Sequence, residues 1–149
     1  METTDQFSSK LIKSSDNSQI PCLQLMKDDQ PFGAPLKGAL IEAQYQVDDG
    51  RHLLFITDDV PYEETLRIYL IASNAEVLDS LEFGGYLANG TLEGLNIVGD
   101  QTIEFRFIHK KRCRLTIERD RGWKKPLAFK PGVNRPGGLK KRYLALDFV

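Results

Sequence analysis

The chain has 149 residues with 20 basic and 21 acidic side chains, and 41% of its residues are hydrophobic. This balance excludes a wholly disordered or fibrous chain and predicts one domain with a substantial core. The longest apolar run, Leu53-Leu54-Phe55-Ile56, is far shorter than the ~18 residues of a membrane-spanning helix. Because the N-terminal residues lack the apolar core of a secretory signal and the two cysteines make no disulfide framework, we expect a cytoplasmic protein without membrane contact.

The N-terminal region is poor in apolar residues. Residues 1–18 are rich in Ser, Asp and Asn, and their only sizeable apolar groups are Phe7, Leu11 and Ile12. Such a segment buries too little surface to offset the entropy of ordering it, so we expect a flexible tail over 1–18. A single all-β domain should then span 19–149. Residues 19–38 contain three prolines and two glycines, which predicts at most a short strand near residues 21–25.

From Ala39 onward, apolar and polar residues alternate with a period of two, which places the apolar ones on one face of a strand. The first such strand carries Ile41, Ala43, Tyr45 and Val47 on one face. Asp48-Asp49-Gly50 predicts a tight turn into a second strand over 51–57. The run 65–72 is apolar on both faces and is therefore expected at the centre of a sheet. A further strand over 76–83 completes a meander.

The second half of the chain repeats this pattern. A weaker strand over 95–98 is followed by two strands in which Ile103, Phe105 and Phe107 face Cys113, Leu115 and Ile117. Closing this hairpin at Ile108 and Arg112 pairs Phe107 with Cys113, Phe105 with Leu115 and Ile103 with Ile117. A slip by one residue would mix the faces. A last strand covers residues 143–149.

Eight strands joined by short turns predict an all-β, antiparallel domain, because parallel strands need long crossover connections. The simplest arrangement is a two-sheet β-sandwich in which two four-stranded meanders, 39–83 and 94–149, pack face to face. A small β-barrel is the alternative.

The charge distribution is uneven. Residues 110–149 hold thirteen basic and three acidic residues, whereas the first 109 residues hold seven basic and eighteen acidic ones. Within the basic part, residues 121–142 have eight cations, no carboxylate and three prolines. This segment is longer than an ordinary connection and lacks a strand or helix pattern, which is typical of a functional loop or a flexible excursion. Its summed charge would attract an anionic partner.

Two kinds of anionic partner fit this basic Pro/Gly-rich loop. One is an acidic protein surface, including the acidic part of a second copy. The other is single-stranded nucleic acid, whose bases would stack on Trp123 and Phe129. A structural interpretation also stands, in which Trp123, Leu127 and Phe129 fasten the loop to the domain. The candidate binding residues are Trp123, Lys124, Lys125, Phe129, Lys130, Arg135, Lys140, Lys141 and Arg142.

A second candidate site is acidic. Asp58, Asp59, Glu63 and Glu64 crowd around Pro61, and crowded carboxylates can bind a hard cation or act as a general acid and base. Their spacing does not match a calcium-binding loop, and a proline turn accounts for the cluster without chemistry. These four residues carry the competing hypothesis of a metal-dependent enzyme.

Other chemistry-bearing residues are isolated. His52 and His109 have no second His or Cys at ligand spacing, and Cys113 falls on an apolar face, where a thiol acts as packing. No G-x-S-x-G or phosphate-loop pattern occurs. We therefore expect no cofactor and favour a binding or protein-interaction module over an enzyme, with an acidic protein surface or self-association as the partner and single-stranded nucleic acid as the alternative.

Overall fold

The computed structural model describes residues 1–12, 20–60, 64–84, 90–108, 111–124 and 132–149. These residues contain fourteen strands and no helix. The strands are β1 (Glu2–Thr3), β2 (Phe7–Ile12), β3 (Cys22–Lys27), β4 (Gln30–Pro31), β5 (Leu36–Lys37), β6 (Leu40–Asp48), β7 (Arg51–Thr57), β8 (Leu66–Ala72), β9 (Val77–Phe83), β10 (Gly90–Gly99), β11 (Thr102–Ile108), β12 (Arg112–Gly122), β13 (Val133–Asn134) and β14 (Arg142–Phe148).

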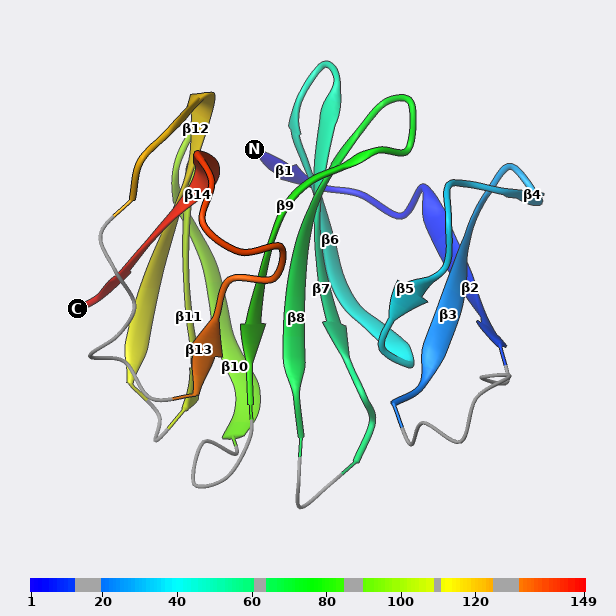
Figure 1. Cartoon of the computed structure of the whole chain (residues 1–149), viewed down its shortest axis with the longest axis horizontal. Helices are drawn as coiled ribbons and strands as arrows, with labels where there is room; N and C mark the ends of the chain where they lie inside the picture. Colours follow the sequence, from blue (N-terminus) through cyan, green and yellow to red (C-terminus); the bar gives the residue numbers. More distant parts are fainter. Residues whose placement is uncertain (13–19, 61–63, 85–89, 109–110, 125–131) are drawn as a thin grey trace.

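Three antiparallel sheets lie side by side as three layers (Figure 1). The central sheet has the order β1-β6-β7-β8-β9-β13. The C-terminal sheet, on one side of it, has the order β10-β11-β12-β14, and the N-terminal sheet, on the other side, has the order β2-β3-β4 with β5 also paired to β3. Each sheet stays open across the described part of the chain, so the alternative of a small barrel does not form.

The two expected meanders are present as β6-β7-β8-β9 and β10-β11-β12-β14. The strand expected at the centre, β8, is buried on both faces. Leu66, Ile68 and Leu70 pack toward the C-terminal sheet, whereas Tyr69 and Ile71 pack toward the N-terminal sheet. This explains why the 65–72 run lacks a polar face.

Aromatic rings join the central and C-terminal sheets. Phe105 of β11 lies edge-on to Phe55 and Phe83 of the central sheet, with ring centroids 5.3 and 5.7 Å apart. Phe107 meets Phe83 in the same way at 6.2 Å. Edge-to-face contacts of this kind add to the burial energy of each ring, so this cluster anchors the interface between the two sheets.

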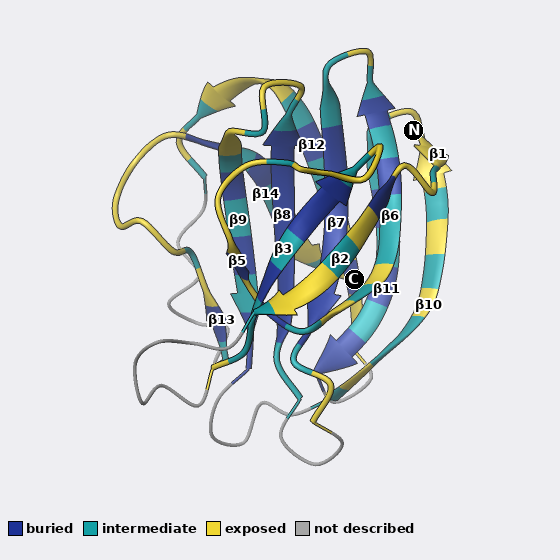
Figure 2. Ribbon diagram, turned by 90° about the vertical axis from the view of Figure 1, so that its right-hand side faces the viewer, coloured by how far each residue is buried: buried dark blue, intermediate teal, exposed yellow. Residues whose placement is uncertain are grey.

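The third layer corrects the expected two-sheet sandwich. β2 pairs with β3 over six residues, and β1 pairs with β6, so residues 2–3 and 7–12 are strands where a flexible tail was expected. Residues 13–18 of that expected tail lie outside the described residues. Phe7, Leu23, Leu25 and Leu36 pack on the face of the central sheet formed by Leu54, Ile56, Tyr69 and Ile71. Seen from this side, the strands beneath are buried while much of β2 is exposed (Figure 2).

The Gln44 side chain is one link between the central sheet and the N-terminal sheet. The Gln44 side chain accepts a hydrogen bond from the Phe7 backbone N–H (3.0 Å) and donates one to the Phe7 carbonyl (2.9 Å). It therefore satisfies both backbone groups of a residue on the edge strand β2. Composition alone underestimated the order of this region because one buried ring, a strand ladder and this clamp act together.

The β11–β12 hairpin has the expected faces but a different register. Phe105 lies opposite Cys113, and Ile103 lies opposite Leu115, so the pairing is shifted by two residues from the prediction. A shift by two leaves every side chain on its original face, and Ile103, Phe105, Cys113 and Leu115 are all buried. Phe105 and its partner are therefore eight rather than ten positions apart in the chain, and the Lys111 N–H donates to the Ile108 carbonyl at 2.9 Å.

A bulge splits the apolar face predicted for β6. Ile41 pairs with Ile56 and Ala43 with Phe55, so Glu42 is an extra residue in the ladder. Ile41 consequently packs toward the N-terminal sheet, whereas Ala43, Tyr45 and Val47 pack toward the C-terminal sheet. The expected tight turn after β6 is present, with Asp48 paired to Arg51.

Candidate binding surface

The basic part of the chain folds around a large irregularity between β12 and β14. Ile117 pairs with Leu144 and Gly122 pairs with Arg142, so residues 118–121 of β12 oppose Tyr143 alone. The surplus residues cannot all lie flat in the ladder and must bend outward. Arg119 and Arg121 are exposed as a result. The segment expected as the patternless loop 121–142 thus includes the end of β12 and the short strand β13.

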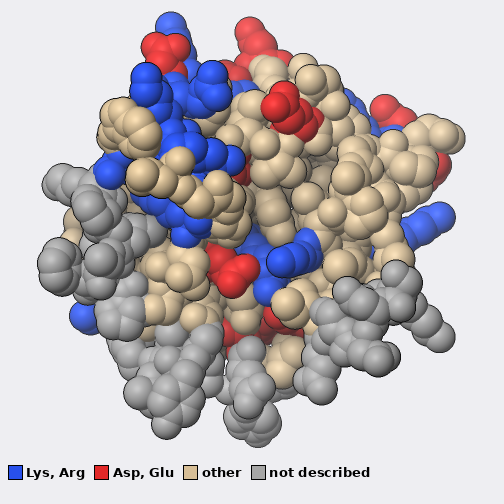
Figure 3. Space-filling view, in the orientation of Figure 1, with Lys and Arg blue, Asp and Glu red and all other residues tan. Residues whose placement is uncertain are grey.

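Exposed cations gather at this end of the C-terminal sheet. We define the basic patch as Arg119, Arg121, Trp123, Lys140 and Lys141, all of which are exposed. The pairing of Gly122 with Arg142 brings the residues that flank Gly122, Arg121 and Trp123, to the end of the sheet where Lys141 leads into β14. Figure 3 shows Lys and Arg side chains concentrated over this region, with an acidic group among them. The bulge itself holds two carboxylates: Glu118, which pairs with Lys124, and the exposed Asp120.

The patch carries a net positive charge. None of its four cations forms an ion pair with a described residue. The Trp123 side chain is 65% exposed and Leu139, beside Lys140, is 94% exposed. Large apolar side chains beside unpaired cations are typical of an interaction surface rather than of a solvated loop.

Three of the sequence-predicted binding residues have internal partners. The Lys124 ammonium pairs with Glu118 and is almost buried. Arg135 donates from Nη1 to the Leu144 carbonyl (2.9 Å), and burial lowers the pKa of its guanidinium. Arg142 is 2% exposed. These residues hold the segment against the domain, whereas the structural interpretation assigned that role to Trp123, Leu127 and Phe129. Trp123 is exposed, and Lys125, Leu127, Phe129 and Lys130 lie outside the described residues.

The partner of Arg142 was missed by sequence reasoning. Arg142 Nη1 donates to Asp79 Oδ1 at 2.9 Å, and Asp79 Oδ2 accepts from the backbone N–H groups of Tyr143 and Leu144, both at 3.0 Å. Asp79 lies on β9 and the other three on β14, so this buried pair links the central and C-terminal sheets. The sequence holds one sign that Asp79 is buried: the residue occupies the same alternating face of its strand as Leu81 and Phe83.

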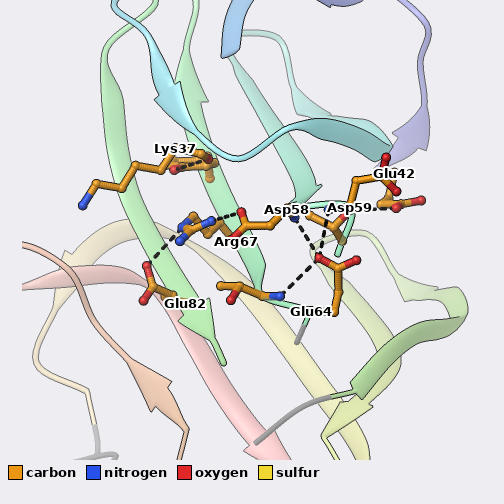
Figure 4. A network of polar contacts seen from close by, with 10 residues as sticks. Lys37, Glu42, Asp58, Asp59, Glu64, Arg67 and Glu82 are labelled. Carbon is orange, nitrogen blue, oxygen red and sulfur yellow. Dashed lines mark hydrogen bonds and ion pairs between the residues drawn. The ribbon is translucent and has the colours of Figure 1, made fainter. Parts of the chain in front are cut away.

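The acidic cluster is occupied by contacts within the fold (Figure 4). Asp58 pairs with Arg67 of β8, which also donates from Nε to Glu82 at 3.1 Å. Glu64 Oε1 accepts from the backbone N–H groups of Asp58 (2.8 Å), Asp59 (3.1 Å) and Thr65 (3.2 Å). Burial raises the pKa of the Asp58 and Glu64 carboxyls, and their hydrogen-bond donors oppose that rise.

These contacts account for two of the four carboxylates, Asp58 and Glu64, whereas the Asp59 side chain is exposed. Among the described residues, no group of three or more His, Cys, Asp or Glu is arranged to hold a metal ion. Glu63 and His109 lie outside the described residues. Cys113 is buried in the core, as expected, and Cys22 is half-buried.

Comparison with family models found no match, and comparison with curated proteins and with solved structures found none. No described helix is long and apolar enough to cross a membrane.

Proposed function

We propose that this chain is a binding module whose basic patch docks against an acidic surface of another protein or of a second copy. One observation carries the proposal: four exposed cations without described ion-pair partners, and an exposed tryptophan, belong to the segments that flank the pairing of Gly122 in β12 with Arg142 in β14. The buried Asp79–Arg142 pair supports the base of the patch. A binding surface on a supported scaffold loses less conformational entropy when it docks.

The side chains of the patch favour a protein partner over nucleic acid. Trp and Arg are enriched in the energetically dominant parts of protein interfaces. Leu139 adds an exposed aliphatic group with no counterpart in base stacking. Single-strand binders instead present several aromatic rings in series, and Trp123 is the one aromatic residue in the described patch. The acidic first 109 residues supply a complementary surface when a second copy is the partner.

The test compares three kinds of partner on one protein preparation. Fluorescence polarisation is measured with a labelled poly-L-glutamate peptide and with a labelled oligothymidylate, and light scattering is measured against protein concentration. The patch variant carries Arg121→Glu and Lys141→Glu. The control carries Lys10→Glu and Lys111→Glu, which are exposed and lie outside the patch.

The proposal expects peptide binding or concentration-dependent mass that falls with salt and is lost in the patch variant but not in the control. Tighter binding of the oligothymidylate than of the peptide, with a loss of about 1–3 kcal/mol of binding free energy on Trp123→Ala, would instead assign the patch to nucleic acid. If the wild-type protein binds neither probe at low salt and stays monomeric, the proposal is wrong.

A further inference from the structure

A separate pocket of about 260 Å³ lies where the N-terminal sheet meets the central sheet. Pro35 and the two residues of β5 form one wall, alternate residues of β8 and β9 form the floor, and Pro136 closes one side. The N-terminal sheet covers Tyr69 of β8 but leaves Ser80 and Glu82 of β9 to line this space. Figure 3 shows acidic and basic side chains meeting near the middle of this face.

The pocket is held in shape by hydrogen bonds across the two sheets. The Tyr69 hydroxyl donates to the Lys37 carbonyl at 2.9 Å, and burial raises the pKa of Tyr69 to about 12, so it remains a donor at neutral pH. Arg67, with a side chain only 6% exposed, is fixed by Asp58 and Glu82. A fixed, partly apolar concavity with a few convergent polar groups is the usual form of a small-ligand site.

Three polar groups at this pocket retain unused bonding capacity. Arg67 donates from Nε and Nη1, and its Nη2 donates to no described residue. Glu82 accepts through Oε2, and its Oε1 accepts from no described residue. Lys37 is exposed and pairs with no described carboxylate, and Figure 4 shows Lys37 and Glu82 extending toward the same side of Arg67.

We propose that this pocket binds a small zwitterion of the amino-acid type. Its carboxylate lies between the Lys37 ammonium and Arg67 Nη2, and its ammonium donates to Glu82 Oε1. The charges of Lys37, Arg67, Glu82 and the adjoining Asp58 sum to zero. An ion of one sign would therefore leave an uncompensated charge in a partly desolvated site, whereas a zwitterion preserves neutrality.

The size and walls of the pocket agree with such a ligand. Its volume lies just below the ~300 Å³ at which pockets for larger organic ligands begin. Leu36 and the two prolines provide apolar contacts for the remainder of the molecule. This site shares no residue with the basic patch, so the two proposals stand or fall separately.

The experiment uses the full chain. Thermal shift with each of the standard amino acids selects the best ligand, and isothermal titration calorimetry then compares it with its N-acetyl and carboxamide derivatives. We expect a saturable rise in the unfolding temperature. Each derivative lacks one charge and should bind about tenfold or more weakly, because a charge-assisted hydrogen bond is lost.

Matched variants locate the site. Lys37→Gln and Glu82→Gln should each weaken binding about tenfold or more, and Ser80→Phe should abolish it by filling the pocket without changing charge. The controls Lys10→Gln and Glu76→Gln, both exposed and outside the pocket, should bind as wild type. The proposal is overturned if no amino acid gives a saturable shift, if either derivative binds as well as its parent, or if Ser80→Phe still binds.

Discussion

Replacing Arg142 by Met tests whether the buried Asp79–Arg142 pair stabilises the fold. The Asp79 carboxylate is 2% exposed and accepts from Arg142, from the backbone N–H groups of Tyr143 and Leu144, and from its neighbour Ser80 at 2.8 Å. Methionine preserves much of the apolar stem but removes the counter-ion, which leaves a buried charge. Breaking a buried ion pair in this way costs about 3–5 kcal/mol, a large fraction of the total stability of a domain.

The assay is urea denaturation followed by far-UV circular dichroism at pH 7, with Lys141→Met as the matched control. Lys141 is the exposed neighbour of Arg142, so its substitution should change the free energy of unfolding by no more than about 0.5 kcal/mol. The double variant Asp79→Asn/Arg142→Met removes both charges. Its loss in free energy of unfolding should be smaller than the sum of the losses in the two single variants. A loss below about 1 kcal/mol for Arg142→Met, or strict additivity in the double variant, would refute this reasoning.

Three further substitutions probe the layers. Phe105→Ala should lower the free energy of unfolding by about 3–5 kcal/mol in urea denaturation, because it leaves a cavity between two buried rings; a loss below about 1 kcal/mol would contradict this. Burial, assisted by Lys27, lowers the pKa of His52 from 6.5 in the unfolded chain. Stability should therefore be greatest above about pH 6.5 and decrease as the pH falls toward the lower folded pKa, because the unfolded state binds the extra proton. His52→Leu should abolish this slope, and an unchanged slope would assign it to other groups. Gln44→Leu should lower the free energy of unfolding by about 1–3 kcal/mol. It should also speed amide hydrogen exchange in β2 but not in β11. Equal acceleration in both strands would exclude a local role for the Gln44–Phe7 hydrogen bonds.

Alternation in the sequence predicted two of the three sheets. Side chains on a strand point to opposite faces in turn, so a period of two identifies both the strand and its buried face without tertiary information. This identified β6 to β9, β11, β12 and β14, and it placed β8 at the centre. The same property limits the prediction of register. A shift by two residues preserves the faces, so the pattern could not decide whether Phe105 pairs with Leu115 or with Cys113.

The candidate surface was predicted as a region but not residue by residue. Charge counting located the basic segment, since a sum of charges needs no structure. It could not separate the exposed Lys141 from its buried neighbour Arg142, the first residue of β14.

Local sequence therefore determined the strands, their faces and the basic segment, while the tertiary structure decided which elements meet. The bulge at Glu42 divides β6 between two cores, and β2 becomes ordered only because the central sheet offers Leu54 and Ile71 to cover. Asp79 and Arg142 lie 63 residues apart and meet only across two packed sheets. Such contacts depend on the geometry of distant segments, whereas periodicity and composition report on neighbours along the chain.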